Sequence, residues 1–406
     1  MSEPKTTLAK GLIFVGVATL VGNGAAYLLS MVAARALTPA EFGALGALLG
    51  ILVIISTVAL ATQALTARRV AVSRSDRATA EGEAVRLSVV VGLTIIVGGL
   101  VVAWPVGKLF AIPVLAVAAG IASLGFTVIS SAALGIAQGR EEHLRFSWAF
   151  IAVQGGRAVG GIVGVLLLRS VTGVGFGVLV GCAVGAAIAY QMICPRTWSA
   201  HLSPAVRGEF LHIVHALMVL FTLTNVDVLL ARVFLTEDQS GEYSVGVLLA
   251  KIAFFLPNAI IIVLFPKMTS GDNRRAVLIA TGLTACVGFV VTGFSFLFGN
   301  FVMRVLGGAQ YSDLGSEAWL FALEGSAFAL VQVLLYARLA TQDKKAVIAV
   351  WVALIALVIA VAGWRHNSVA EIVTTVVAVS MVLTIVGLFM DLRTAPGVPI
   401  PVESAE

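Results

Sequence analysis

Long apolar segments follow one another along almost the whole chain, and they limit most strongly what this sequence can fold into. A helix needs about 20 apolar residues to cross the hydrocarbon core of a bilayer. Segments of about that length recur roughly twelve times between Gly11 and Met390. Only 12% of the residues are charged, which is too few for a soluble domain. We therefore predict an all-α polytopic membrane protein with about twelve transmembrane helices.

A helical hairpin near the N-terminus recurs in the second half of the chain. The first copy runs from Met31 to Gly50 and the second from Val228 to Ala250. In both copies an apolar helix ends in Ala-Arg, Leu-Thr and an acidic turn follow, and a glycine begins the next apolar run. The matched residues are Arg35 and Arg232, Thr38 and Thr236, and Gly43 and Gly241. This parallel repeat predicts two six-helix lobes around a central cavity, an arrangement that suits alternating access.

The Lys and Arg residues predict how the chain lies in the membrane. We expect lobes at residues 11–195 and 211–391, a linker at 196–210, and short ends at 1–10 and 392–406. With alternating spans, most basic residues fall on the side of the N-terminus. The opposite side carries only Arg35, Lys108, Arg169, Arg304 and Arg365. Because cytoplasmic loops are enriched in Lys and Arg, both termini are predicted to be cytoplasmic.

Two segments of the chain resemble a known family of membrane proteins. Asp227–Met268 resembles the seventh and eighth helices of polysaccharide-biosynthesis proteins, and Gly22–Gly43 resembles the start of the same family. These are the lipid-linked oligosaccharide flippases of the multidrug/oligosaccharidyl-lipid/polysaccharide (MOP) exporter superfamily. The resemblance implies two lobes in a V around a central cavity. It also implies transport of a polyprenyl-diphosphate-linked glycan from the inner to the outer leaflet of a bacterial inner (plasma) membrane.

The same resemblance sets the expected partners. They are the lipid-linked glycan itself, membrane lipids, and a polysaccharide polymerase or glycosyltransferases of the same pathway. No nucleic acid partner is expected. The expected function is transport for cell-surface polysaccharide biosynthesis, and the identity of the glycan is not encoded in any motif of the sequence.

Arg157 is a charge near the middle of an apolar segment, preceded by Gln154, Gly155 and Gly156. A charge inside the bilayer is costly and marks a functional position or an ion pair. A guanidinium pairs with phosphate through two parallel hydrogen bonds, and glycines allow close approach of a ligand or another backbone. We therefore expect Arg157, with Gln154, to bind the diphosphate, and the alternative is a buried ion pair between helices.

The repeated arginines, Arg35 and Arg232, stand at the predicted outer ends of their helices. One interpretation adds them to the diphosphate site, at its outer mouth. The other is that each side chain extends to the membrane interface, as arginine does at helix ends.

Asp227, Lys251 and Glu324 are predicted to lie at one depth in the second half. Related exporters of the superfamily place cation-coordinating carboxylates in this half. The resemblance thus makes Asp227 a candidate Na⁺ or H⁺ site, with Asn225 and Thr224 as further oxygen donors. The alternative is that Lys251 neutralises Asp227 or Glu324. We expect no other cofactor and no metal centre.

Enzymatic activity is not expected. The sequence lacks the glycine-rich phosphate-binding loop that ends in Gly-Lys-Ser/Thr, and no soluble domain is inserted that could hold a catalytic site. Two other functions remain open beside the flippase. One is a multidrug or cation antiporter of the same superfamily, and the other is a non-transporting scaffold for envelope assembly.

Overall fold

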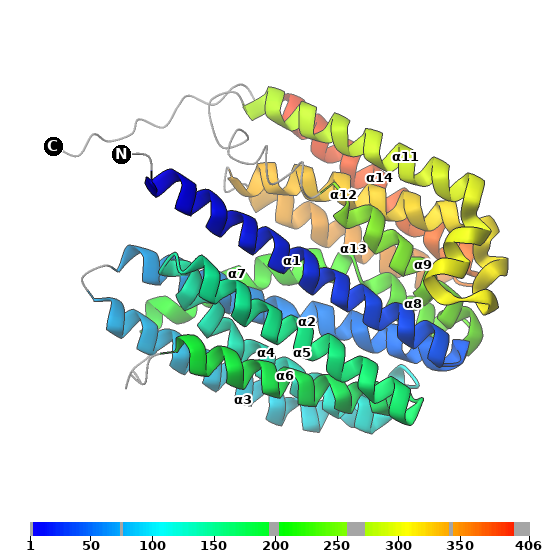
Figure 1. Cartoon of the computed structure of the whole chain (residues 1–406). Coiled ribbons are helices and arrows are strands. Elements are labelled where there is room, and N and C mark those ends of the chain that lie inside the picture. The colour runs from blue at the N-terminus through cyan, green and yellow to red at the C-terminus, as the bar shows by residue number, and fades with distance from the viewer. Residues whose placement is uncertain (1–2, 74–75, 195–202, 258–272, 341–343, 394–406) are drawn as a thin grey trace. The chain divides into compact units, whose positions relative to one another are not determined.

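The computed structural model describes residues 3–73, 76–194, 203–257, 273–340 and 344–393 (Figure 1). Every regular element within these residues is helical, which confirms the predicted all-α fold. The elements are α1 (Glu3–Ala36), α2 (Pro39–Val72), α3 (Arg77–Leu109), α4 (Val114–Gly139), α5 (His143–Leu168), α6 (Val171–Ile193), α7 (Pro204–Leu223), α8 (Val226–Phe234), α9 (Glu237–Phe255), α11 (Asn273–Gly307), the 3₁₀ helix η1 (Ala309–Glu317), α12 (Ala318–Ala340), α13 (Lys344–Trp364) and α14 (Val369–Arg393).

Most of these helices are long and apolar enough to cross a membrane. Within the described residues, ten helices meet that condition, and Ile348–Trp364 forms a shorter apolar helix. The segment predicted as a seventh single span is instead broken into α7 and α8 at Thr224 and Asn225. The chain is therefore a multi-pass membrane protein.

The chain forms two compact units, residues 1–241 and 242–406, and α9 passes from one to the other. This division differs from the predicted lobes because α7 and α8 pack against α2. The predicted linker at 196–210 lies partly outside the described residues, as does nearly all of the tail at 392–406.

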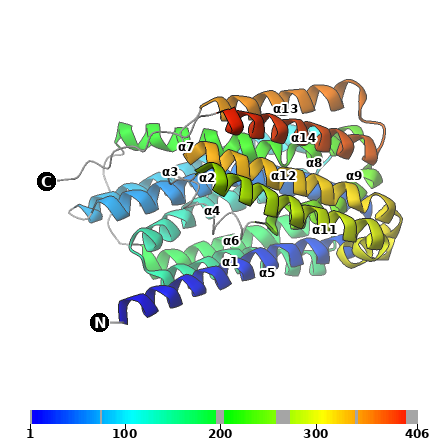
Figure 2. The same cartoon turned by 90° about the horizontal axis from the view of Figure 1, so that it is seen from above.

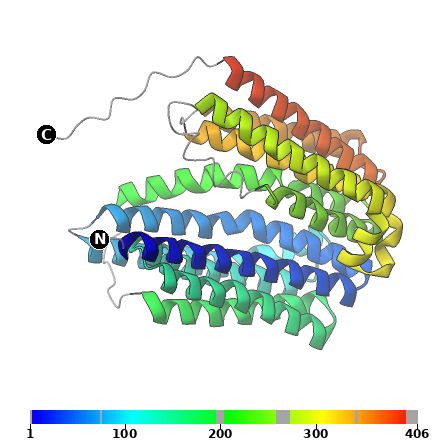
Figure 3. The ribbon, with the colours of Figure 1, turned by 45° about the horizontal axis from the view of Figure 1, so that its top comes forward.

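In the first unit, α4 lies against α2, α3, α5 and α6, and α1 packs along α5 (Figure 2). Figure 3 shows these helices running roughly side by side, as they would in a bilayer. We call the end that carries the α1–α2 and α3–α4 turns the distal end, and the end that carries the α4–α5 turn the proximal end. In the second unit, α12 packs against α11, α13 and α14.

A glycine stripe joins α5 to α6. Gly156 faces Gly181, Gly160 faces Gly177, and Gly164 faces Gly173. A Cβ atom at any of these positions would collide with the backbone of the facing glycine. Small residues at every fourth position let two membrane helices approach closely, since the driving force there is van der Waals packing. The stripe therefore fixes the face of α5 that packs against α6, and with it the direction of the other faces of α5.

Ion pairs hold the proximal end of the first unit together. Arg140 donates from Nε and Nη2 to the two carboxylate oxygens of Glu81, at 2.6 Å each, and Glu81 is only 3% exposed. Arg68 pairs with Glu209 at 2.5 Å. The first pair joins α3 to the α4–α5 turn, and the second joins α2 to α7. Two-point guanidinium–carboxylate pairs of this kind add geometric specificity as well as energy.

Candidate functional site

Arg157 lies near the middle of α5 on a face that runs along α1. Gln154, Arg157 and Gly161 share this face because they are separated by three and four residues. A Cβ atom on Gly22 of α1 would lie 3.1 Å from Gln154 Cβ, and Gly161 is in contact with Leu29 of α1. Arg157 therefore lies beside α1, at a level between Gly22 and Leu29.

The Arg157 guanidinium has no protein partner in the described part of the chain. It makes no hydrogen bond and no ion pair there, and its side chain is half-buried. The thiol of Cys182 on α6 lies near the guanidinium. The alternative of a buried ion pair therefore finds no support among these residues. An unpaired charge at this depth is costly, so an anion that reaches it would be bound favourably.

The glycines before Arg157 have separate roles. Gly156 belongs to the stripe against α6, so its lack of a side chain serves helix packing rather than approach of a ligand. A Cβ atom on Gly155 would meet only Ile151, a turn earlier in α5, at 4.0 Å. Space beside the helix is therefore left at Gly155 and not at Gly156.

The break between α7 and α8 is built by two side chains that turn back on the end of α7. Asn225 Nδ2 donates to Phe221 O at 2.9 Å and to Thr224 Oγ1 at 3.2 Å. Side chains that bond to the backbone in this way compete with helix continuation. Asn225 is 2% exposed, and its Oδ1 atom has no hydrogen-bond partner in the described structure. The break thus leaves a buried oxygen acceptor.

Asp227 follows directly, in the first turn of α8, and is 1% exposed. A carboxylate is favourable at a helix N-terminus because the helix dipole is positive there. Gly50 of α2 lies opposite, where a Cβ atom would be 3.6 Å from Asn225 O. Of the residues predicted as a cation site, Thr224 and Asn225 thus form the break, and Asp227 lies in the helical turn that follows it.

Lys251 and Glu324 lie at one level of the second unit, on α9 and α12. A Cβ atom on Gly325 would collide with the backbone of Ala250, so the two helices touch beside these charges. The ring of Tyr243 lies 5.3 Å from that of Phe321, one to two turns away along the same two helices. Asp227 lies in the first unit, whereas Lys251 and Glu324 lie in the second.

Arg232 is buried at the distal end and bonds to backbone oxygens from distant segments. Nε donates to Phe110 O and Nη2 to Ala111 O, both at 2.9 Å. Nη1 donates to Ser240 Oγ at 3.0 Å and to Ala40 O at 3.3 Å. Ala111 has a φ of 47°, a left-handed conformation that is unfavourable for alanine. The guanidinium thus ties α8 to the α3–α4 turn and to the start of α2.

Arg35, the repeat counterpart of Arg232, is exposed at the end of α1. The side chain of Arg232 is 3% exposed, and Glu237 Oε1 lies 3.7 Å from its Nη2 atom. Neither sequence interpretation describes Arg232 in this conformation. Because protein acceptors engage its donors, the Arg232 guanidinium is a poor diphosphate contact, whereas Arg35 stays a predicted contact at the outer mouth.

The two copies of the repeated hairpin meet each other at the distal end. A Cβ atom on Gly43 would collide with Ser240, and one on Gly241 would collide with the backbone of Pro39. Thr38 and Glu41 cap α2 reciprocally, and the side chains of Thr236 and Gln239 make the same two bonds at the start of α9. The matched glycines therefore allow two capped helix starts to cross in contact.

The comparisons with known proteins agree with this architecture. Residues 8–272 match the model of a family described as polysaccharide biosynthesis protein. The chain belongs to the polysaccharide biosynthesis protein family. No curated protein matches the chain.

Solved structures similar to this family member are transporters of the MOP superfamily. An inward-facing multidrug resistance MATE family transporter has a TM-score of 0.75 at 16% identity, over 90% of this chain and 93% of that one. An outward-facing MATE transporter has a TM-score of 0.68 at 14% identity, over 95% of both chains. A MOP transporter from Pyrococcus furiosus, described as having a binding pocket of reverse polarity, has 0.65 at 16%, also over 95% of both. At such identities, the likeness shows that the polysaccharide biosynthesis protein has the MOP transporter fold.

Sequence reasoning missed two features of this polysaccharide biosynthesis protein. The glycine stripe of α5 and α6 was detectable, since glycines recur at every fourth residue in both helices. The bonding of Arg232 had no sequence signal, because its acceptors are mostly backbone carbonyls of remote segments.

Proposed function

We propose that the protein flips a polyprenyl-diphosphate-linked oligosaccharide from the cytoplasmic to the outer leaflet of a bacterial inner membrane, by alternating access. Both termini are cytoplasmic in this proposal, so the distal end is the outer end. Membership of the polysaccharide biosynthesis family and the MOP fold support it. The observation that carries it is the Arg157 guanidinium, which lies near the middle of α5 with no hydrogen-bond or ion-pair partner in the described part of the chain.

Arg157 and Gln154 would act together on the diphosphate. The planar guanidinium offers two parallel N–H groups to the phosphate oxygens, and its charge offsets the desolvation of the anion. The Gln154 amide lies on the same face of α5 and offers a further donor. The prenyl chain remains in lipid, and enzymes of the pathway make the lipid-linked glycan and use it after transport.

A leaflet-resolved assay of lipid-linked intermediates tests this function. In a strain that lacks the protein, we expect the precursor to accumulate in the cytoplasmic leaflet and the surface glycan to be lost. Expression of the protein from a plasmid should reverse both effects. Unchanged glycan and precursor distribution together with altered drug tolerance would instead support the multidrug antiporter.

We further propose that a cation bound at the α7–α8 break is coupled to transport. Buried oxygens from Asn225 and Asp227 suit Na⁺, and a buried carboxylate also suits a proton. Thr224 contributes by orienting Asn225, whose Nδ2 atom donates to the Thr224 hydroxyl oxygen. Glu324 and Lys251 form a second ionisable pair for the same coupling, in the second unit.

Asp227→Asn should remove the dependence of flipping on an ion gradient, because the amide neither carries a proton nor offers a negative charge to Na⁺. The measurement is the initial rate in vesicles with imposed Na⁺ or pH gradients. Asp238→Asn changes an exposed carboxylate of α9 and should retain the wild-type response. Two results would contradict coupling at this site. One is a wild-type flipping rate that changes with neither gradient, and the other is an Asp227→Asn rate that still changes with them.

A further inference from the structure

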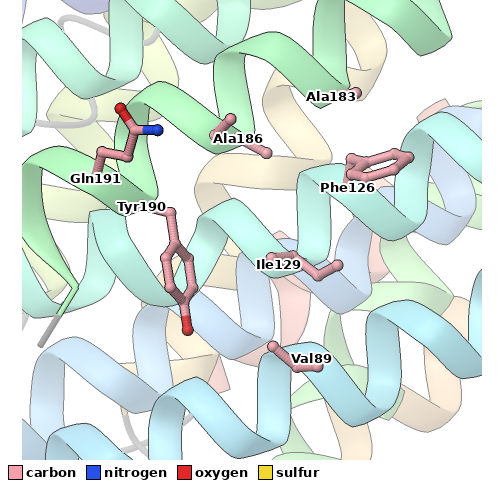
Figure 4. Close-up of a pocket in the computed structure, with 8 residues that line it drawn as sticks. Val89, Phe126, Ile129, Ala183, Ala186, Tyr190 and Gln191 are labelled. Carbon is pink, nitrogen blue, oxygen red and sulfur yellow. The ribbon is translucent and has the colours of Figure 1, made fainter. Parts of the chain in front are cut away.

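A groove of about 350 Å³ opens between α3, α4 and α6 of the first unit. Its walls are Val89 of α3, Phe126 and Ile129 of α4, and Ala186 and Tyr190 of α6 (Figure 4). Almost all of this lining is apolar. Figure 4 shows the Tyr190 side chain extending from α6 toward α3, with Ile129 and Val89 beside it. The groove is therefore a shallow apolar channel that small side chains of α6 leave open.

The groove faces the surface that a bilayer would cover. Val90 of α3 is 48% exposed, and Val184 and Ile188 of α6 are 52% and 41% exposed. All three flank the groove in sequence and lie in helices that are long enough to span a membrane. Exposed apolar side chains of membrane helices contact lipid, so hydrocarbon is what reaches this groove.

Polar groups gather where the groove approaches the proximal end. Tyr190 and Gln191 line it in the last turn of α6, close to where that helix ends at Ile193. Arg86 precedes Val89 by three residues on α3, so it lies one turn nearer that end on nearly the same face. A cation one helical turn beyond an apolar channel complements an anionic lipid, whose phosphate lies beyond its acyl chain.

We propose that this groove binds one anionic phospholipid of the proximal leaflet, with an acyl chain along α4 and its headgroup near Arg86. The transported lipid is a poorer occupant, because Arg157 lies on the face of α5 that packs along α1, whereas the groove is formed by α3, α4 and α6. Its volume is at the lower end of ligand sites, which suits a single acyl chain. The site is independent of the transported substrate.

Lipid retention by the purified full-length protein tests the proposal. The protein is exchanged into phosphatidylglycerol or phosphatidylcholine micelles, then examined by native mass spectrometry and thermal unfolding. Ala187→Trp fills the groove from an exposed position of its lining. Retained phosphatidylglycerol should fall roughly tenfold, equivalent to about 1.4 kcal/mol of binding. Val180→Trp, on the same helix at a 61% exposed position outside the lining, should retain lipid as the wild type does.

Arg86→Gln separates the headgroup contact from the chain contact. We expect it to lose the preference for phosphatidylglycerol over phosphatidylcholine while Arg86→Lys keeps it. Equal retention of both lipids by the wild type would overturn the proposal, as would full retention by Ala187→Trp. Co-purification of a polyprenyl-diphosphate lipid that Ala187→Trp releases would also overturn it, because the occupant would then be the substrate.

Discussion

Arg157→Gln should leave a folded, inserted protein that no longer flips its lipid-linked substrate at a useful rate. A charge-assisted hydrogen bond contributes about 1.5–3 kcal/mol, so loss of both guanidinium–phosphate bonds should lower the rate by about a hundredfold or more. Arg157→Lys keeps the charge without the two-point geometry, so its flipping rate should lie between those of the wild type and Arg157→Gln. The measurement is the initial flipping rate in proteoliposomes, normalised to inserted protein.

Stability separates the binding role of Arg157 from a structural one. Since its guanidinium has no hydrogen bond or ion pair to the described residues, the thermal unfolding midpoint of Arg157→Gln should equal or exceed that of the wild type. Arg169→Gln, at the exposed end of the same helix, is the matched control and should flip normally. A wild-type rate in Arg157→Gln would contradict the diphosphate role. A lowered midpoint would indicate a structural ion pair instead.

Arg232→Ala should have the opposite signature, a large loss of stability at the distal end. The substitution deprives Phe110 O, Ala111 O and Ala40 O of their donor. A buried acceptor left without a partner costs about 1–3 kcal/mol, and these three lie in part-buried hydrogen bonds that water partly replaces, so we expect a total loss of about 2–4 kcal/mol. The measurement is thermal unfolding of the purified protein, together with the amount of folded protein in membranes.

The repeat supplies the control for that experiment. Arg35 holds the matching position in the repeated hairpin but is exposed, so Arg35→Ala should change stability by no more than about 0.5 kcal/mol. Arg232→Lys should recover little of the lost stability, because a single ammonium group cannot reach all the acceptors that the guanidinium reaches on several sides. Equal unfolding midpoints for Arg232→Ala and Arg35→Ala would show that the network of Arg232 does not stabilise the protein.

The α7–α8 break shows where prediction from the apolar pattern stopped. Residues 211–235 form one apolar run without proline or glycine, so a single helix was the natural expectation. The helix ends because Asn225 returns a hydrogen bond to Phe221 O, a choice between local partners that hydrophobicity does not encode. The same break contains Thr224 and Asn225 and directly precedes Asp227, the residues of the candidate cation site.

Gly43 and Gly241 illustrate the intermediate case. Their place in the repeated hairpin was visible in the sequence, and the paired threonine caps follow from the same pattern. The sequence did not show that each glycine lies against the other copy of the hairpin, because this contact joins segments from opposite halves of the chain.

The sequence by itself determined that this protein is a bundle of membrane helices with a duplicated hairpin. It could do so because a bilayer requires long apolar helices, whose length and spacing are properties of the sequence alone. Only the tertiary structure decided how deeply each charge is buried and which acceptors Arg232 reaches. Arg35 and Arg232 occupy matched positions of the repeated hairpin, yet Arg35 is exposed and Arg232 is bonded to carbonyls 121, 122 and 192 residues away. Arg157, whose face meets α1, finds no such acceptor among the residues that the structure describes, because hydrogen-bond partners at a distance are fixed by packing.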